Sequence, residues 1–403
     1  MKTLITVILL FSLSMQCYAS ENEDLANKVK QLETEIEKLK SSVATKSTEE
    51  KNEPSGIKLG GAVRFQYVYE DYNDDNTSRG GDLDFDVFRL DLNGEVGGVI
   101  LSAQYRWFQY MDVIHHAWVG YDFDKQWQGQ IGITRVPFGN LGYNSHNYFF
   151  SSNYYVGLED DYDAGIKFIR KNDKHDLRVA FFFTDEVGGI DGYVDDRSDR
   201  YSYDIVGIRA NDEGIWDQPA DEVAEHNTFN LRYAYQFDNI EVGFSWLSGD
   251  IRDASASVGD RTAFAVHTDA QFDRWNVKLQ YTDYQYDFNQ YSPSIAVGAY
   301  SFYDSIPSEA KLYTVNVAYL KPVKLGPIRS LNFYNNYNLM TDKSGDYHND
   351  TIMNVLGVAI ASGGLYTYVD LVRAKNQPFV GGTMAGDSDE WQTRFNINFG
   401  YYF

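Results

Sequence analysis

Long apolar runs, cysteine and positive charge are all scarce in this 403-residue sequence. The longest apolar stretch, from Leu4 to Met15, is shorter than the roughly 18 residues that a helix needs to cross a bilayer, so a helical membrane protein is excluded. A single cysteine, Cys17, excludes a disulfide framework. The 35 Lys and Arg stand against 58 Asp and Glu, and the net charge of -23 argues against nucleic acid as a partner, because nucleic acid requires a basic surface.

The first 19 residues have the pattern of a cleavable secretory signal. Lys2 precedes the apolar stretch, and Cys17 and Ala19 supply small residues at the two positions that a signal peptidase reads. Acylation of Cys17 as a lipoprotein is the less favoured alternative, because Gln16 is a poor residue before an acylated cysteine. We therefore expect a signal peptide over residues 1–19, whose removal leaves the mature chain without a thiol.

Aromatic residues are abundant, and they alternate with polar ones. The sequence holds 32 Tyr, 25 Phe and 7 Trp, which suits the aromatic girdles of a membrane barrel. In the last ten residues one parity is apolar and the other is small or polar, as on the two faces of a strand; the apolar set is Phe395, Ile397, Phe399, Tyr401 and Phe403. A soluble sheet would bury this face in a core, whereas a membrane barrel turns it toward lipid. The segment resembles the terminal strand of bacterial outer-membrane barrels, which implies that Phe399, Tyr401 and Phe403 belong to the signal read by the barrel assembly machinery.

The segment 20–43 has a heptad pattern, with Leu at the d positions and β-branched residues at the a positions, which predicts a short coiled coil. The seam consists of Leu25, Val29, Leu32, Ile36, Leu39 and Val43. A coiled coil of under three heptads is only marginally stable by itself, and a single amphipathic helix is the alternative. The a/d chemistry by itself favours a dimer, but contacts between barrels would dominate so short a zipper, so we expect a homotrimer. Residues 44–56 have no periodicity and are expected to form a linker.

From residue 57 to 403 the period is two, which predicts an all-β domain, a transmembrane antiparallel β-barrel of about 16 strands. The expected strands lie near 57–69, 84–96, 101–107, 115–123, 126–136, 163–171, 176–184, 229–235, 240–249, 261–272, 275–286, 313–319, 329–341, 350–361, 364–375 and 390–403. Short junctions such as Gly97-Gly98 alternate with long polar loops at 140–162, 185–226, 287–309 and 376–389. A barrel of this size is expected to enclose an aqueous channel.

Four consecutive segments resemble the opening half of the phosphate-selective (O/P-type) porin family. They are Asp86–Glu95, which carries Arg89, then Val99–Phe108, His116–Tyr121 and Gly129–Gly139, which ends in G-x-x-x-x-P-F-G before a long loop. The resemblance implies a sixteen-stranded trimeric diffusion channel in the outer membrane of a Gram-negative bacterium, surrounded by lipid and lipopolysaccharide. The loop departs from the family pattern because it is aromatic and acidic rather than basic. Its candidate constriction residues are Tyr143, Tyr148, Tyr154, Glu159, Asp160 and Asp161.

Strand parity also predicts which side chains line the pore. The candidates opposite the apolar face are Lys58, Arg64, Arg89, Asp91, Arg106, Lys167, Arg178, Arg232, Lys278 and Arg394. Basic residues outnumber acidic ones in this set, while the excess acid lies in the loops. A basic wall facing an acidic loop predicts a transverse field and an anion-leaning channel for small hydrophilic solutes, phosphate or similar.

Catalytic and metal-binding patterns are weak. The pair His115-His116 lies in an expected strand, where neighbouring side chains point to opposite faces, so no metal pair is expected there. We predict no enzymatic activity, no catalytic residues, no cofactor and no dedicated metal site, although the acidic loops are candidates to collect Ca²⁺ or Mg²⁺ together with lipopolysaccharide. The alternatives left open are a structural anchor whose coiled coil reaches the periplasm, an outer-membrane barrel enzyme and a secreted β-sandwich enzyme.

Overall fold

The computed structural model describes residues 56–210, 212–290 and 292–403. The predicted signal peptide, the coiled-coil seam from Leu25 to Val43 and the linker up to residue 55 lie outside the described residues. Among the described residues, no helix is long and apolar enough to cross a membrane.

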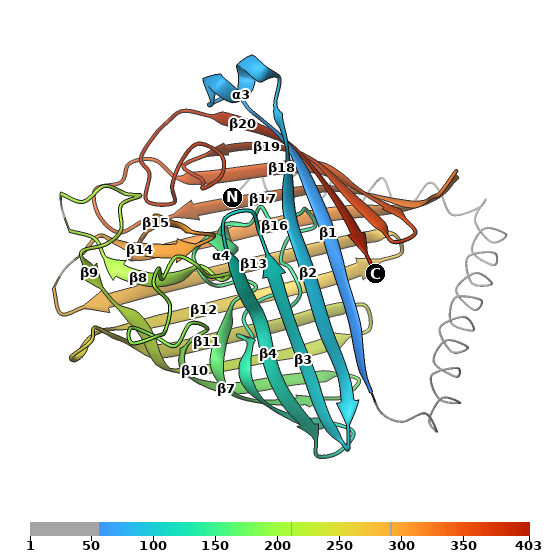
Figure 1. Ribbon diagram of the computed structural model, residues 1–403, viewed down its shortest axis with the longest axis horizontal. Coiled ribbons are helices and arrows are strands. Elements are labelled where there is room, and N and C mark those ends of the chain that lie inside the picture. The colour runs from blue at the N-terminus through green and yellow to red at the C-terminus, as the bar shows by residue number, and fades with distance from the viewer. Residues whose placement is uncertain (1–55, 211, 291) are drawn as a thin grey trace, which may run out of the picture. The chain divides into compact units, whose positions relative to one another are not determined.

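Sixteen antiparallel strands form a closed barrel (Figure 1). They are β1 (Ile57–Glu70), β2 (Asp82–Val96), β3 (Val99–Trp107), β4 (Asp112–Asp122), β5 (Trp127–Arg135), β6 (Tyr162–Lys171), β7 (His175–Asp185), β10 (Ala224–Phe237), β11 (Ile240–Arg252), β12 (Ser257–Phe272), β13 (Trp275–Phe288), β16 (Glu309–Leu325), β17 (Ile328–Thr341), β18 (Thr351–Ser362), β19 (Leu365–Lys375) and β20 (Gln392–Tyr402). The fold class, the strand number and the order of the strands predicted from the sequence are confirmed. Alternation of apolar and polar residues was a sufficient signal because each wall strand has two unlike faces.

The first and last strands close the barrel against each other. β1 pairs with β20 from Ala62 opposite Tyr402 to Glu70 opposite Arg394. The backbone of Phe403 adds two hydrogen bonds, accepting from Gly61 N at 2.9 Å and donating to Gly61 O at 3.1 Å. A Cβ on Gly61 would lie 2.8 Å from Cζ of Phe403, so the aromatic ring occupies the surface that the glycine leaves bare.

The two faces of the wall differ as the parity analysis predicts. Large apolar side chains are exposed on the outer face, among them Phe65, Ile131, Phe244, Val315, Leu356 and Phe399. The inner face is polar and largely buried, with Asn230, Ser245, Thr314, Asn336 and Asn396 as examples. Closure of the sheet leaves no strand edge unpaired, and the exposed apolar band presents its surface to lipid.

The two rims of the barrel differ in the length of their connections. At one rim the turns are short, as at Gly97-Gly98, whose φ values of 60° and 83° fit the type I′ turn of a tight hairpin. At the other rim the connections between β5 and β6, β7 and β10, β13 and β16, and β19 and β20 are long. This asymmetry is typical of outer-membrane barrels, in which the long loops are extracellular.

The long loops are not irregular throughout, which corrects the expectation for 185–226 and 287–309. They contain β8 (Asp204–Ile208), β9 (Asp221–Glu222), β14 (Ser294–Ala299) and β15 (Phe302–Pro307), which form a separate four-stranded sheet in the order β15-β14-β8-β9, here called the inner sheet. Two short helices, α3 (Asp74–Arg79) and α4 (Ser152–Tyr155), lie in other loops. Runs such as Ile295-Ala296-Val297 are buried on both faces, so they show no alternation to detect.

The inner sheet and the loops pack an apolar core on the inner side of the wall. Phe150 and Tyr155 of the β5–β6 loop join Ile205 and Ile306 of the inner sheet and Met353 of the wall in one buried cluster. Figure 1 shows α4, β8 and β14 within the outline of the barrel. The long loops therefore fold back and fill part of the barrel interior.

Candidate pore constriction

The β5–β6 loop, residues 136–161, crosses the inside of the barrel. Its backbone N–H groups donate to side chains of distant wall strands: Gly139 to Ser245 Oγ at 3.0 Å, His146 to Asn336 Oδ1 at 3.1 Å and Ser152 to Asn338 Oδ1 at 3.2 Å. These acceptors belong to β11 and β17. The polar inner face of those strands thus satisfies a loop backbone that would otherwise be buried without partners.

Two of the predicted pore-lining cations hold this loop in place. Arg232 Nε donates to Gly139 O at 2.8 Å, and Lys278 Nζ donates to Tyr143 O at 2.5 Å. Gly139 has a φ of 58°, and a Cβ there would lie 2.2 Å from Gln280 Oε1. The glycine of the P-F-G ending therefore allows the loop to turn inward against the wall.

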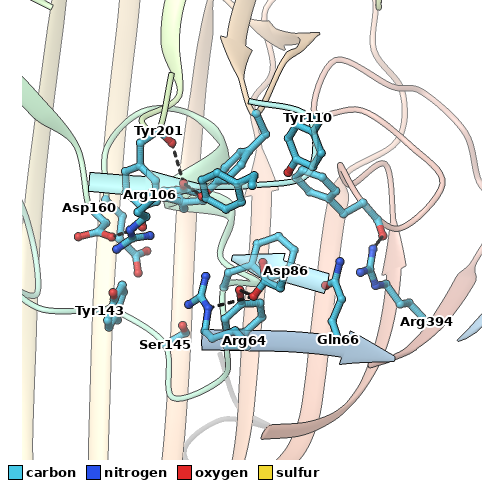
Figure 2. Close-up of a pocket in the computed structure, with 17 residues that line it drawn as sticks. Arg64, Gln66, Asp86, Arg106, Tyr110, Tyr143, Ser145, Asp160, Tyr201 and Arg394 are labelled. Atoms are coloured by element: carbon cyan, nitrogen blue, oxygen red, sulfur yellow. Dashed lines mark hydrogen bonds and ion pairs between the residues drawn. The ribbon is translucent and has the colours of Figure 1, made fainter. Parts of the chain in front are cut away.

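A cavity of about 110 Å³ lies between this loop and the strands β1–β3 and β20. Five of the six constriction candidates line it, namely Tyr143, Tyr148, Tyr154, Glu159 and Asp160, whereas Asp161 does not. Arg64, Arg106 and Arg394 of the predicted wall set line it as well. Figure 2 shows Asp160 and Arg106 toward one end of the cavity and Arg394 toward the other. The structure thus brings together residues from both sequence-derived sets.

The charges in this cavity are partly compensated. Arg64 Nε lies 3.0 Å from Asp86 Oδ2, and the Tyr148 hydroxyl donates to the same oxygen at 2.6 Å. Arg394 contacts Glu70 at 3.4 Å. Arg106 differs, because it forms no ion pair with a carboxylate among the described residues. It lies instead 4.3 Å from the centre of the Tyr201 ring, and its Nε donates to Gln104 Oε1 at 2.7 Å.

Asp160 joins the loop to the wall at one end of the cavity. Its carboxylate pairs with Arg135 and accepts a hydrogen bond from the Tyr201 hydroxyl at 2.7 Å. Next to it, burial raises the pKa of Glu159, although the Ser151 hydroxyl and the Asn144 N–H both stabilise the charged form. On the same loop, burial lowers the pKa of His146 to about 4, so this ring is neutral at physiological pH.

The other wall candidates lie apart from this cavity. Arg178 and Arg232 line a second cavity of about 380 Å³ and pair with Asp176 and Glu241. Arg89 pairs with Asp91 at 2.7 Å. Lys167 Nζ donates to Arg135 O at 2.7 Å, and Lys58 is exposed near the start of β1. Arg64, Arg106 and Arg394 are therefore the predicted wall cations that the structure gathers at one place.

The expectation that the side chains of His115 and His116 point to opposite faces is wrong. The register between β3 and β4 shifts here, so that Gln104 faces His116, Tyr105 faces Ile114 and His115 has no partner across the ladder. This bulge lets both rings lie on one side, where their Nδ1 atoms are 2.8 Å apart. The rings pack against Tyr162 and contact no described carboxylate closer than 4.0 Å. The pair does not line the cavity.

Several residues around the cavity were not predicted from the sequence. Asp86 lies beside the bulge between Arg64 and Phe65, so strand parity alone does not place it. Tyr201 and Tyr300 come from the β7–β10 and β13–β16 loops, and the Tyr300 hydroxyl lies 2.6 Å from that of Tyr154. No local signal identifies such residues, because only the folding of the long loops brings them to the cavity.

The closed barrel, its lipid-facing band and the inward loop together define the class of outer-membrane β-barrels with a porin-type architecture. Comparison with solved structures agrees. One similar structure is OmpT of Vibrio cholerae in its trimer form, with 12% sequence identity, 87% of this chain and 100% of that chain covered, and a TM-score of 0.54. A second is the outer membrane channel DcaP of Acinetobacter baumannii, with 13% identity, 87% and 98% of the two chains covered, and a TM-score of 0.53. A third is Salmonella typhi OmpF in complex with daunomycin, with 10% identity, 86% and 97% of the two chains covered, and a TM-score of 0.57.

At these identities the likeness is one of fold. No protein-family model matches the chain, and no curated protein sequence matches it. The resemblance to the phosphate-selective family therefore stays a prediction from the sequence.

Proposed function

We propose that this protein is a porin, a passive diffusion channel for small hydrophilic solutes and ions across the outer membrane, which works as a homotrimer. The observation that carries the proposal is the β5–β6 loop, which is hydrogen-bonded across the lumen and narrows the barrel with charged and aromatic side chains. A lipid-embedded barrel with a constricting inner loop is suited to selecting solutes by size and charge.

We propose further that the channel has a weak preference for anions. Arg64 and Asp86 form a neutral pair, whereas Arg106 adds a positive charge without a carboxylate in contact among the described residues. Arg64, Arg106 and Arg394 line this cavity with Asp86, Glu159 and Asp160, so its charges balance in number. A solute that passes meets Arg106 as the cation that has no carboxylate in contact among the described residues. The tyrosine side chains around these groups offer hydroxyl hydrogen-bond donors and flat aromatic faces to a passing solute.

The test is the reversal potential of single channels in a planar bilayer under a KCl gradient. Arg106→Gln removes the uncompensated charge and should move the reversal potential toward cations. One charge about 4 Å from the path of an ion is worth about 1 kcal/mol in bulk water and more in less polar surroundings, so we expect the permeability ratio to change by roughly fivefold or more.

The matched control is the double variant Arg64→Gln/Asp86→Asn. It removes a neutral pair from the same cavity and should leave the reversal potential nearly unchanged. A protein that inserts and folds but shows no conductance would contradict the porin proposal. A conducting channel in which Arg106→Gln has no effect would contradict only the proposed selectivity.

A further inference from the structure

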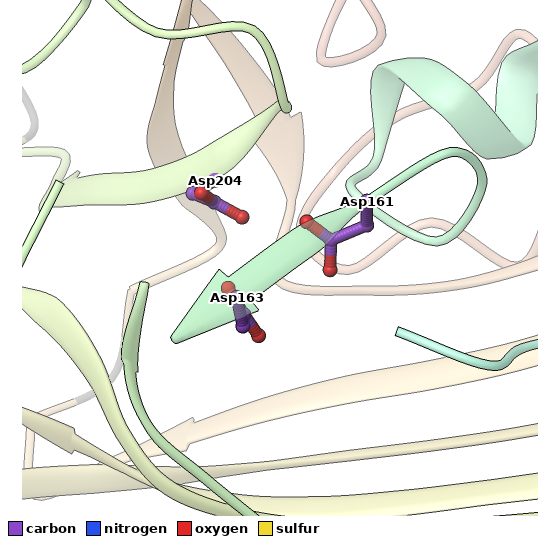
Figure 3. Close-up of side chains that lie close together, drawn as sticks. All are labelled: Asp161, Asp163 and Asp204. Atoms are coloured by element: carbon purple, nitrogen blue, oxygen red, sulfur yellow. The ribbon is translucent and has the colours of Figure 1, made fainter. Parts of the chain in front are cut away.

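Three buried aspartates meet where the inward loop ends. Asp161 is the last residue before β6, Asp163 lies in β6 and Asp204 begins β8 of the inner sheet. One carboxylate oxygen from each lies within 4.8 Å of the others. Figure 3 shows Asp161 and Asp163 on one stretch of chain at the start of β6 and Asp204 on the neighbouring strand β8. All three residues are at most 3% exposed.

Four of the six carboxylate oxygens in this cluster lack hydrogen-bond partners. Both carboxylate oxygens of Asp161, Oδ1 of Asp163 and Oδ1 of Asp204 are buried without a hydrogen bond. A buried carboxylate in this condition is strongly destabilising unless a cation or a hydrogen-bond donor compensates it. Asp161 is the clearest case, because neither of its oxygens has a partner and the residue is 3% exposed.

The surrounding arginines do not balance the charge. Arg261 lies 3.7 Å from Asp163 and also pairs with Glu225. Arg200 lies 2.7 Å from Asp204 and is shared with Asp185 and Glu186, and Arg197 also pairs with Asp185. With Asp161 included, six carboxylates face three guanidinium groups. With every carboxylate ionised, this buried network is short of three positive charges.

We propose that Asp161, Asp163 and Asp204 bind one Ca²⁺ ion. The donor set consists only of carboxylate oxygens, which suits hard cations and not zinc or copper, whose sites use histidine or cysteine. Ca²⁺ fits better than Mg²⁺, because it accepts irregular geometry and bidentate carboxylates, while Mg²⁺ demands a near-ideal octahedron and keeps several waters.

The position of the site gives the ion a structural role. It would join the end of the constriction loop, the barrel wall at β6 and the inner sheet at β8. Asp160, which contacts Arg135 and Tyr201 in the cavity, is the residue directly before Asp161. An ion held at Asp161 would therefore fix the loop at one end of the candidate constriction. This inference does not depend on the channel function.

The test is isothermal titration of CaCl₂ into the full-length protein, purified in detergent, freed of lipopolysaccharide and stripped with EDTA. The expected result is one site per chain with a Kd of about 10⁻⁴ M or tighter. Asp161→Asn and Asp204→Asn should each weaken binding by at least roughly tenfold. The matched control is Asp304→Asn, which alters a buried carboxylate of β15 in the same inner sheet but outside the cluster, and which should bind Ca²⁺ like the wild type.

A second measurement keeps the proposal testable if a variant folds poorly. The midpoint of the heat-induced shift in gel mobility should rise with CaCl₂ in the wild type and fall back with EDTA. Three results would overturn the proposal: no saturable binding by the wild type, binding that survives both Asn substitutions, or MgCl₂ binding as tightly as CaCl₂. The proposal would also be overturned if the Asn variants were more stable than the wild type both in EDTA and in saturating Ca²⁺. Asn resembles a protonated Asp, so this result would show that loss of negative charge, without a bound ion, relieves the repulsion in the cluster.

Discussion

At the scale of single residues, most arginines of the inner wall are paired. Arg64, Arg89, Arg178 and Arg232 each contact a carboxylate that also lies inside the barrel. Strand parity predicts which side chains face inward, but it cannot count the carboxylates that arrive from bulges and neighbouring strands. Arg106 is the arginine of the candidate constriction that has no such partner among the described residues, and the proposed charge selectivity depends on it.

A buried carboxylate of the inner sheet makes stability depend on pH. Burial raises the pKa of Asp304 from about 3.8 to about 7, although Thr383 and the Ser305 N–H favour the charged form. The folded state therefore binds this proton more tightly than the unfolded state. The contribution of Asp304 to stability is fully present below about pH 4 and is lost as the pH rises through about 7.

Asp304→Asn should remove this dependence. We expect the variant to match the wild type near pH 4 and to be more stable at pH 8, by up to about 4 kcal/mol for a shift of about three pH units. The midpoint of the heat-induced gel-mobility shift at both pH values is the measurement. Asp191→Asn, which alters an exposed loop carboxylate, is the control. A wild type whose midpoint is flat between pH 4 and pH 8 would contradict the role assigned to Asp304.

At the scale of elements, the contact between β1 and β20 closes the whole structure. The ring of Phe403 lies over Gly61, and the two backbones exchange a pair of hydrogen bonds. A closed barrel has no free strand edge, so a weakened seam exposes unpaired backbone groups to lipid, where each is costly. The last strand thus combines an apolar face for lipid with the final bonds of the ladder.

Phe403→Ala should lower the amount of folded protein in the outer membrane by severalfold at strong expression. Heat-modifiable migration on gels of membrane fractions measures this amount. Phe333→Ala is the matched control, because Phe333 is a similarly exposed aromatic residue on the outer face of β17. Phe333 is 44% exposed and Phe403 is 56% exposed, but Phe333 lies far from the seam. Equal folded amounts for the two variants would argue against a special role for Phe403 in assembly.

At the scale of the whole molecule, the negative charge is unevenly placed. The chain carries a net charge of -23, but the candidate constriction contains an uncompensated arginine. Acidic residues of the long loops, such as Asp191 and Asp195, lie toward the mouth. Their field is screened over about 8 Å at physiological salt, whereas the charges of the cavity act at contact distance.

The ion preference of the channel should therefore change with ionic strength. We expect weak anion preference at 1 M KCl and a shift toward cations at 10–50 mM, where the acidic mouth is less screened. Reversal potentials at a fixed concentration ratio and several mean concentrations measure this. A preference that stays constant across the series would refute the division between wall and mouth.

Residues 25–43 are predicted to reinforce the trimer as a parallel coiled coil. Their deletion should lower the temperature at which the oligomer dissociates on unheated gels while leaving the monomeric barrel folded. Leu32→Ala/Ile36→Ala, which removes two seam side chains and keeps the length, should act in the same direction. If the shortened protein remains a trimer of undiminished heat resistance, the segment has another role.

The wall of the barrel could be predicted from the sequence alone because its information is local. Each of the sixteen strands alternates between lipid and lumen, so that parity separates Phe399 from Asn398 and Leu90 from Arg89 without knowledge of any partner. The same period predicts that the wall cations face the lumen, and the breaks between periodic segments mark the short turns.

The interior was decided by the tertiary structure. Strands β8 and β14 of the inner sheet are buried on both faces and have no period. The β5–β6 loop docks on Ser245 and Asn336, about a hundred or more residues away, and Tyr201 reaches the cavity from another loop. Asp204 meets Asp161 and Asp163 only because the inner sheet packs beside the start of β6. Contacts between distant segments depend on how the long loops fold inside a closed wall, and no local pattern of residues encodes that choice.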